Sequence, residues 1–248
     1  MKPFFWSESF HVRAFESDAE GKATIAGILN HLQEAAGSHA GMLGLSVVQL
    51  LPQGLTWVLS RIIVTMHRYP VYRDRVRLET WPAGVDRFMA LRDFELFGSN
   101  ESLIASVRTQ WVMVDLATMR PVALPQNVHE IASANTRFAM PLESPRVSKL
   151  EGDGEYARSF SVRRSDIDLN RHVNNVNYLI WALEAVPDEV AAHKRPYEVD
   201  LVFRNETHYG DEIISRCSSI EGDGTVFQHR IDRKSDGKEV FLAVTRWR

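Results

Sequence analysis

The sequence has very little cysteine and no long hydrophobic run. Cys217 is the single cysteine in 248 residues, so an internal disulfide and a cluster of thiolate metal ligands are both excluded. No stretch approaches the roughly 18 consecutive apolar residues that a membrane-spanning helix needs. The amino-terminal residues become acidic at Glu8 before the apolar core of a signal peptide can form, and they lack a transit-peptide pattern. We therefore expect a cytoplasmic protein without a membrane span.

The sequence also lacks a large excess of charge of either sign. Its formal net charge is -3 at pH 7, hydrophobic residues make up 44% of the chain and charged residues 25%. This is the composition of a soluble globular protein. A general nucleic-acid-binding protein usually carries a strong basic excess, so we expect no nucleic-acid partner.

The 9 histidines form no recognisable metal-binding pattern, since none stands in an HExxH motif or in paired metal-ligand spacing. We therefore predict no metal and no cofactor. Cys217 lies in a strand-like segment, and we interpret it as a small half-buried hydrophobic residue in preference to a nucleophile.

What the sequence does contain is the same unit twice. Each half has the pattern of a strand, a long helix and then several strands. Residues 64–74 align with residues 201–211 at an offset of 137, and Thr109-Gln110-Trp111 aligns with Thr245-Arg246-Trp247 at an offset of 136. Two independent matches at nearly the same offset favour a duplication over chance. The predicted strands are 5–15, 55–66, 75–81, 88–97 and 104–114 in the first half, and 156–163, 197–206, 212–220, 226–233 and 240–247 in the second.

The helix of each half is predicted from apolar residues at helical spacing. In the first half these residues run from Ile25 to Ala36, and in the second half they are Val176, Ile180 and Leu183, with Pro187 ending the helix. A long helix followed by antiparallel strands predicts a sheet wrapped around that helix. Two such units can bury a large core and leave an apolar channel for a long ligand.

Residues 121–154 are rich in proline and glycine and form the predicted linker, with a short helix near residues 128–133. We assign residues 1–138 to an N-terminal unit that includes linker, and residues 139–248 to a C-terminal unit.

The most informative segment is Asp168–Tyr178. Asp168, Asn170 and His172 stand at alternate positions, so in an extended or turning segment their side chains can lie on one side. A helical pattern begins directly after them, and backbone N–H groups at a helix N-terminus favour developing negative charge. The arrangement suits chemistry on a carbonyl, although such residues are also common helix caps and turn formers.

The stretch from Ser165 to Pro187, with the core Asp168-x-Asn170-x-His172-Val173-Asn174-Asn175, strongly resembles the fatty acyl–acyl-carrier-protein (acyl-ACP) thioesterases, namely the plant plastid enzymes and their shorter bacterial relatives. The likeness extends to residues 32–34, 69–74, 79–81 and 92–93 of the first half, so it covers most of the chain. The resemblance implies an α+β double hot-dog fold, with two antiparallel sheets, each wrapped around a long helix, in one chain.

The resemblance further implies an active site made of Asp168, Asn170, His172 and an acid on a later strand of the second unit, which matches Glu206. Glu206 is expected to act as base for water or to attack the carbonyl itself, and His172 to share that proton or protonate the leaving sulfur. Asn170 is expected to hold the water or the carbonyl, and Asp168 to fix the loop.

Backbone N–H groups of Val173 and Asn174 are expected to complete an oxyanion site. Plant members of the family have a cysteine after the glutamate, whereas this chain has Thr207, so a cysteine nucleophile is not required here. The first half has Tyr69 where the second has Glu206, and residues 17–22 contain no histidine. We therefore predict that the second unit carries catalysis and that the first shapes the acyl-binding channel.

The predicted function is hydrolysis of the acyl-ACP thioester, which releases free fatty acid and ends fatty acid synthesis. Acyl-ACP is the predicted partner, and the chain is expected to be a monomer or a homodimer. Three alternatives remain open: an acyl-CoA thioesterase, a hot-dog dehydratase of 3-hydroxyacyl thioesters, and a non-catalytic acyl-binding protein. Basic residues near the site in sequence are candidates for docking an acidic carrier, namely Arg163, Arg164, Arg171, Lys194 and Arg195.

Overall fold

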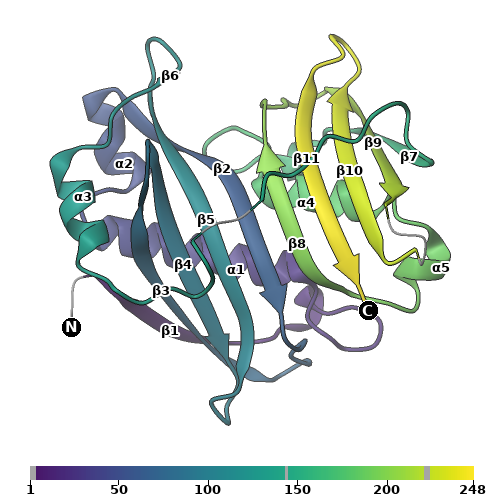
Figure 1. The fold of residues 1–248 in the computed structure, drawn as a ribbon, viewed down its shortest axis with the longest axis horizontal. Helices are drawn as coiled ribbons and strands as arrows, with labels where there is room; N and C mark the ends of the chain where they lie inside the picture. The colour runs from purple at the N-terminus through teal and green to yellow at the C-terminus, as the bar shows by residue number, and fades with distance from the viewer. Residues whose placement is uncertain (1–3, 143–144, 221–223) are drawn as a thin grey trace. The chain divides into compact units, whose positions relative to one another are not determined.

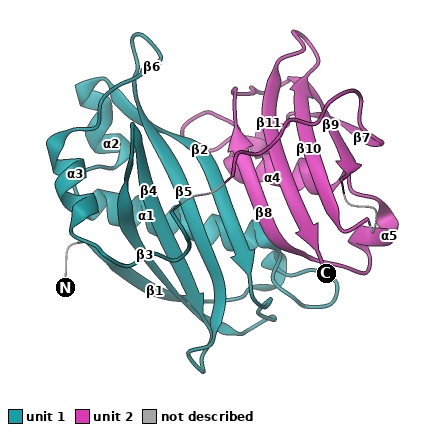
Figure 2. Cartoon of the chain, in the orientation of Figure 1, with its two compact units in different colours: residues 1–144 teal, residues 145–248 magenta. Residues whose placement is uncertain are grey.

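The computed structural model describes residues 4–142, 145–220 and 224–248, and it divides the chain into two compact units (Figure 2). The first unit is Met1–Ser144 and the second is Pro145–Arg248. Residues 139–141 belong to the first unit because Asp93 and Arg108 bind their backbone groups. The division therefore falls a few residues after the expected boundary at 138.

An antiparallel sheet with a long helix on one face makes up most of the first unit (Figure 1). Helix α1 (Ile25–Met42) begins at Thr24, whose hydroxyl accepts the N–H of Gly27 as an N-cap. The short helices are α2 (Val47–Leu50) and α3 (Gln126–Ser133). The strands follow the order β1 (Trp6–His11), β3 (Arg75–Asp86), β4 (Met89–Phe97), β5 (Leu103–Asp115) and β2 (Leu55–Met66), and β6 (Arg120–Pro121) pairs with β5.

The second unit repeats this order with a shorter helix. Helix α4 (Asn175–Leu183) has 9 residues, half the length of α1, and is followed by α5 (Asp188–Ala191). The strands follow the order β7 (Tyr156–Ser161), β9 (Glu212–Ser219), β10 (Val226–Arg233), β11 (Glu239–Trp247) and β8 (Pro196–Phe203), and all pairs are antiparallel. Each of the five long strands of the first unit thus has a counterpart in the second unit, and the two-residue strand β6 has none among the described residues.

The Thr-x-Trp match has the same geometry in both units. In β5 the indole N–H of Trp111 donates to the Thr109 hydroxyl at 2.8 Å. In β11 the indole N–H of Trp247 donates to the Thr245 hydroxyl, also at 2.8 Å. A side-chain contact shared at equivalent strand positions agrees with the duplication inferred from the sequence.

Burial of the helices follows the prediction closely in α1 and less closely in α4. The six apolar residues predicted at helical spacing in α1 are at most 8% exposed, namely Ile25, Ile28, Leu29, Leu32, Ala35 and Ala36. In α4 the buried face follows Val176, Leu179 and Ala182, a spacing of three that turns Ile180 outward to 38% exposure, so its prediction as part of the buried stripe was wrong. Each fully buried Leu or Ile contributes roughly 1.5–3 kcal/mol, and these faces hold helix to sheet.

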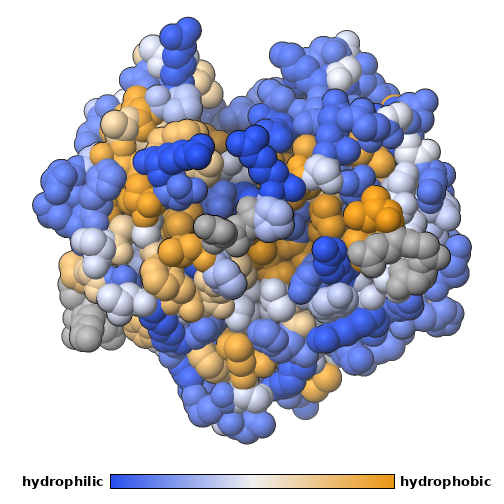
Figure 3. Space-filling model, viewed as in Figure 1, coloured by the Kyte–Doolittle hydropathy of each residue, from blue (hydrophilic) through white to orange (hydrophobic). Residues whose placement is uncertain are grey.

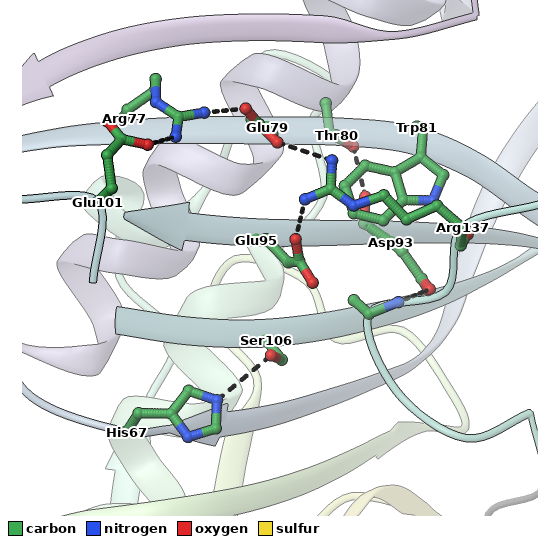
Figure 4. Close-up of polar contacts among 11 residues, drawn as sticks. His67, Arg77, Glu79, Thr80, Trp81, Asp93, Glu95, Glu101, Ser106 and Arg137 are labelled. Carbon is green, nitrogen blue, oxygen red and sulfur yellow. Dashed lines mark hydrogen bonds and ion pairs between the residues drawn. The ribbon is translucent and has the colours of Figure 1, made fainter. Parts of the chain in front are cut away.

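The segment after α3 is held against the sheet face of the first unit that lies opposite α1 (Figure 4). The indole N–H of Trp81 donates to the carbonyl of Arg137 at 2.8 Å, and the Arg137 guanidinium lies 4.3 Å from the Trp81 ring centroid. The Arg137 side chain also pairs with Glu79 and Glu95. Much of the predicted linker is therefore a packed part of the first unit.

Hydrophilic residues cover most of the face shown in Figure 3. Among the described residues, no helix combines the length and the apolar composition needed to cross a membrane.

Candidate active site

The segment before α4 forms a tight turn that brings His172 to the start of the helix. The N–H of Arg171 donates to the carbonyl of Asp168 at 3.0 Å, and the N–H of Asp168 donates to the carbonyl of His172 at 2.8 Å. Arg171 has a positive φ of 65°, which lets the chain reverse within these few residues. Because the turn is closed at both ends, the direction of His172 follows from backbone geometry.

The carboxylate of Asp168 holds this turn from inside. Its Oδ1 accepts the backbone N–H of Asn170 at 2.8 Å and lies 3.4 Å from the N–H of His172. This is the local side-chain-to-backbone pattern that Asp favours in turns. The geometry agrees with the loop-fixing role expected for Asp168.

Helix α4 begins beside the turn, with Asn174 as its N-cap. The Asn174 side-chain oxygen accepts the N–H of Val176 at 3.0 Å. The backbone N–H of Asn174 already donates to the carbonyl of Asp166 at 2.9 Å. An oxyanion role for the Asn174 N–H would therefore require this bond to break.

His172 and Glu206 form the centre of the candidate site. The Nδ1 atom of His172 lies 3.1 Å from Oε2 of Glu206, and the two side chains are 45% and 46% exposed. His172 comes from the turn and Glu206 from the loop after β8, more than thirty residues later. The two atoms are within ion-pair distance, and both side chains are open enough to meet a substrate and water.

Two further predicted positions behave differently. Asn170 is exposed at the tip of the turn, and in the described part of the chain no hydrogen bond joins its side chain to His172 or Glu206. His208, which the sequence suggested to be a surface turn residue, is exposed, and its ring centroid lies 6.2 Å from that of His172. Its proximity was visible only in three dimensions.

The residue after Glu206 is buried and is held by α4. The side chain of Thr207 is fully buried, and its hydroxyl lies 2.8 Å from the hydroxyl of Tyr178. The N–H of Thr207 donates to the same Tyr178 oxygen at 3.1 Å. On the other side of this peptide, the guanidinium of Arg233 donates to the carbonyl of Glu206 at 2.9 Å. Sequence reasoning gave neither Tyr178 nor Arg233 a role.

The single cysteine lies away from these contacts. Cys217 is fully buried rather than half-buried, and its thiol donates to the carbonyl of Ala185 at 3.0 Å. Burial raises the pKa of the thiol to about 12. A thiol with this pKa is not ionised near neutral pH, which agrees with its interpretation as a packed hydrophobic residue.

The equivalent turn of the first unit has the same backbone with different side chains. The N–H of Gly21 donates to the carbonyl of Asp18 at 3.0 Å, and the N–H of Asp18 donates to the carbonyl of Lys22 at 2.8 Å. Asp18 Oδ1 accepts the N–H groups of Glu20 and Lys22. Lys22 therefore occupies the position of His172, and Tyr69 aligns with Glu206.

The basic residues suggested for carrier docking lie in different settings. Arg163 pairs with Asp166 at 3.1 Å, and Arg164 lies 4.4 Å from the ring centroid of Tyr209. Arg171 is exposed in the turn, and Lys194 and Arg195 follow α5. Their docking role stays a prediction.

Across the described residues, no group of three His, Cys, Asp or Glu side chains could hold a metal ion.

The fold and the site define a class: a hot-dog protein with a duplicated unit, one copy of which carries an imidazole and a carboxylate beside a helix N-terminus. The sequence matches the family model of the acyl-ACP thioesterase N-terminal domain over residues 4–132 and that of the C-terminal domain over residues 151–248. The chain belongs to the acyl-ACP thioesterase family.

Individual relatives agree with this membership. The chain is 32% identical to the oleoyl-acyl carrier protein thioesterase of Coriandrum sativum over 235 residues, which are 88% of this chain and 63% of the relative. The crystal structure of an acyl-ACP thioesterase from Bacteroides thetaiotaomicron has a TM-score of 0.88 and 25% identity, with 98% of each chain covered. The 12:0-ACP thioesterase from Umbellularia californica has the same TM-score and identity, with 98% of this chain and 97% of that chain covered.

The plant relatives are longer than this chain. It spans between 61% and 63% of the length of three of them, the coriander enzyme and two from Cuphea.

Proposed function

We propose that this chain hydrolyses the thioester of fatty acyl-ACP, which releases free fatty acid and ends fatty acid synthesis. Family membership supports the reaction class. The observation that carries the proposal is the 3.1 Å contact between His172 and Glu206, which one unit has and the other replaces with Lys22 and Tyr69. A pair kept in one copy of a duplicated fold points to chemistry rather than to folding.

In the proposed reaction, Glu206 takes a proton from water as the water oxygen attacks the thioester carbonyl. The carboxylate uses one oxygen for His172 and has a second oxygen for the water. The C–S bond of the tetrahedral intermediate then breaks, and His172 delivers a proton to the leaving sulfur. The proton gained by Glu206 passes to His172 along their contact, so both groups return to their starting state.

Three nearby groups complete the proposal. The Asn170 amide holds the water or the carbonyl, which requires its exposed side chain to turn toward the substrate. The N–H of Val173 stabilises the oxyanion, and that of Asn174 can join only when its bond to the Asp166 carbonyl breaks. Asp168 holds the turn.

A second route, in which Glu206 attacks the carbonyl and forms an anhydride, uses the same residues. The two routes are separated by a single turnover in ¹⁸O-labelled water. Direct attack places the label in the fatty acid. If water opens the anhydride at the Glu206 carbonyl, the first-turnover product carries an unlabelled enzyme oxygen and the label stays on Glu206, an outcome that direct attack does not give; opening at the acyl carbonyl labels the fatty acid, as direct attack does.

The first unit is proposed to bind the acyl chain, within residues 1–138. Between α1 and the sheet it contains a small apolar cavity with room for about one water molecule, which an acyl chain would have to widen. Its lining includes Leu32 and Ala36 from α1, Ile62 from β2, Phe94 from β4 and Trp111 from β5. The same proposal includes a cytoplasmic location and a monomeric or dimeric state. It also includes docking of the carrier protein through five basic residues, namely Arg163, Arg164, Arg171, Lys194 and Arg195.

The test is thiol release from matched acyl-ACP and acyl-CoA substrates by the wild type, His172→Ala and Glu206→Ala. We expect turnover by the wild type, with acyl-ACP preferred, and a loss of about 10²–10⁴ in rate for each variant. Preference for acyl-CoA would favour the acyl-CoA thioesterase. Acyl binding without thiol release by the wild type would contradict hydrolysis and favour a non-catalytic binding protein.

A further inference from the structure

We infer that Tyr178 and Arg233 clamp the peptide bond between Glu206 and Thr207 and so act as positioning residues for the Glu206 carboxylate. This inference rests on the proposed function, because it assumes that the direction of the Glu206 side chain matters for turnover. It adds two residues, from helix α4 and strand β10, to the site formed by the turn and the loop after β8.

The two contacts act on the same peptide unit. The carbonyl of Glu206 accepts from the Arg233 guanidinium at 2.9 Å, and the N–H of Thr207 donates to the Tyr178 hydroxyl at 3.1 Å. A peptide is planar, so hydrogen bonds at its carbonyl and at its N–H together set the rotation of the whole plane. That rotation fixes ψ of Glu206 and hence restricts the direction of its Cα–Cβ bond.

Arg233 is itself held by two carboxylates. Its Nε and Nη2 atoms bind the two carboxylate oxygens of Asp236 at 3.0 and 2.7 Å, a bidentate contact, and Nη1 lies 3.7 Å from Asp211. The side chain is only 15% exposed. Hydrogen bonding with Arg233 lowers the pKa of Asp236, so this carboxylate stays ionised at neutral pH.

Tyr178 is fixed by aromatic packing. It is 4% exposed, and its ring centroid lies 5.4 Å from that of Trp181 and 5.8 Å from those of Phe203 and Phe241. Its hydroxyl has two contacts with Thr207, one with the side chain and one with the backbone. The position of the hydroxyl is therefore set by the core of the second unit.

Glu206 needs such support because its own side chain is loosely held. It is 46% exposed and lies against His172, which is itself 45% exposed. An ion pair open to water to this degree contributes little and does not fix a geometry by itself. A carboxylate at the end of a loop reaches a reproducible position only when the backbone beneath it is constrained.

The first unit shows what the fold alone requires. When the helices are aligned at their N-caps, Thr24 and Asn174, Ile28 of α1 corresponds to Tyr178 of α4. The first unit therefore has no hydroxyl at this position. The match of 64–74 with 201–211 aligns Pro70 with Thr207, which removes the N–H. Arg77 pairs with Phe97 across β3 and β4, and Ile214 pairs with Asp232 at the equivalent place across β9 and β10. The next residues, Gly98 and Arg233, are therefore equivalent, and the first unit has no guanidinium at this position.

The first unit nevertheless keeps the ion pair beside the clamp. Arg68 lies 3.7 Å from Asp74, as Arg233 lies 3.7 Å from Asp211, although the two arginines come from different elements. The arginine–aspartate contact therefore belongs to the fold. The two side chains that make the peptide contacts, Tyr178 and Arg233, are replaced by Ile28 and Gly98 in the first unit, and this difference ties them to the unit that has His172 and Glu206.

The test compares Tyr178→Phe and Arg233→Ala with Arg230→Ala, a matched control. Arg230 lies on the same strand and donates to the carbonyls of Leu150 and Gly152 at 2.7 and 2.8 Å, away from Glu206. We expect kcat to fall about 10–100-fold in the two clamp variants, with KM nearly unchanged, because misplacement of a catalytic group by about 1 Å has costs of this order. Arg230→Ala should stay near wild type.

Further variants separate positioning from stability. Arg233→Lys retains one donor and should recover part of kcat. Thr207→Val removes the hydroxyl contact with Tyr178 but keeps the backbone N–H contact. If Thr207→Val and Tyr178→Phe lower the melting temperature equally, kcat should still fall far less in Thr207→Val. The pH profile of kcat/KM should shift in the clamp variants and not in Arg230→Ala.

Combination with Glu206→Gln decides the outcome. If the clamp acts through Glu206, adding Arg233→Ala or Tyr178→Phe to Glu206→Gln should cause almost no further loss. If the clamp variants keep the kcat of Arg230→Ala while Glu206→Gln loses activity, the clamp is overturned and the proposed role of Glu206 stands. A fully active Glu206→Gln would overturn the proposed role of Glu206 and the clamp with it. Should Arg233→Ala fail to fold, Tyr178→Phe and Arg233→Lys give the same decision.

Discussion

At the scale of single residues, burial separates side chains that can do chemistry from side chains that only pack. His172 and His229 are both in the second unit, but His172 is 45% exposed while His229 is fully buried in β10 with Nε2 2.8 Å from the Thr245 hydroxyl. Burial lowers the pKa of His229 to about 3, and the nearby carbonyl of Ala182 opposes this shift only in part. The chemistry of a histidine is thus decided by its surroundings.

His229 should make the protein sensitive to acid. The unfolded chain binds a proton at His229 below its ordinary pKa of about 6.5, whereas the folded protein resists protonation until about pH 3. Stability contributed by this residue is therefore present above pH 6.5 and is lost as the pH falls toward 3, at about 1.4 kcal/mol per pH unit.

Replacement of His229 by Phe, the residue at the equivalent Phe94 of the first unit, should flatten the fall of the unfolding free energy between pH 6 and pH 4. Urea unfolding at several pH values measures this slope. The exposed His193→Gln serves as control and should keep the wild-type slope. If the unfolding free energy of His229→Phe falls with decreasing pH as steeply as that of the wild type, His229 is not the source of the acid sensitivity.

At the scale of the element, the segment after α3 is joined to the first sheet by a buried ion pair. Arg108 and Asp93 are both fully buried and make two contacts of 2.7 Å. The guanidinium also donates to the carbonyls of Met140 and Pro141, and Asp93 accepts the N–H of Ala139. Each charge therefore compensates the other and satisfies a backbone group of the segment.

Asp93→Ala should lower the unfolding free energy by about 3–5 kcal/mol, because it leaves the Arg108 charge buried without its partner. Urea unfolding monitors stability, and limited proteolysis monitors release of residues 135–141. Glu101→Ala, which removes the 70% exposed partner of Arg77, is the control and should cost about 1 kcal/mol or less. Equal losses in the two variants would argue against a buried-pair effect.

The elements differ in how well the sequence predicts them. β2 and β10 were predicted with the bounds that the structure has, because alternation of apolar and polar residues is a local signal. The inclusion of Ile180 in the buried face was wrong, since the sheet, and not the spacing within α4, selects the face that is covered. The contacts of Arg108 with residues 140 and 141 join positions more than thirty residues apart and leave no local pattern.

At the scale of the whole molecule, the duplicated fold supplies its own control. The turns at Asp18 and Asp168 share their backbone hydrogen bonds, so they place Lys22 and His172 alike in their units. Lys22→Ala should leave kcat nearly unchanged, whereas His172→Ala should reduce it by about 10²–10⁴. Similar losses in both variants, measured by thiol release, would mean that catalysis is not confined to the second unit.

The sequence by itself determined the repeated strand and helix pattern, the family resemblance and the three polar positions Asp168, Asn170 and His172, because these depend on local periodicity and on a contiguous motif. It also placed Glu206 by alignment. Only the tertiary structure decided which of these groups touch, with His172 and Glu206 at 3.1 Å and Asn170 left at the tip of the turn.

The roles inferred for Tyr178 and Arg233 likewise came from the tertiary structure. Both residues act through a peptide that lies 29 and 27 residues away in the chain. Hydrogen bonds across such separations depend on how helix and strands pack, and the residue types alone carry no sign of them. The sequence therefore predicts which groups react, and packing determines the geometry in which those groups are held.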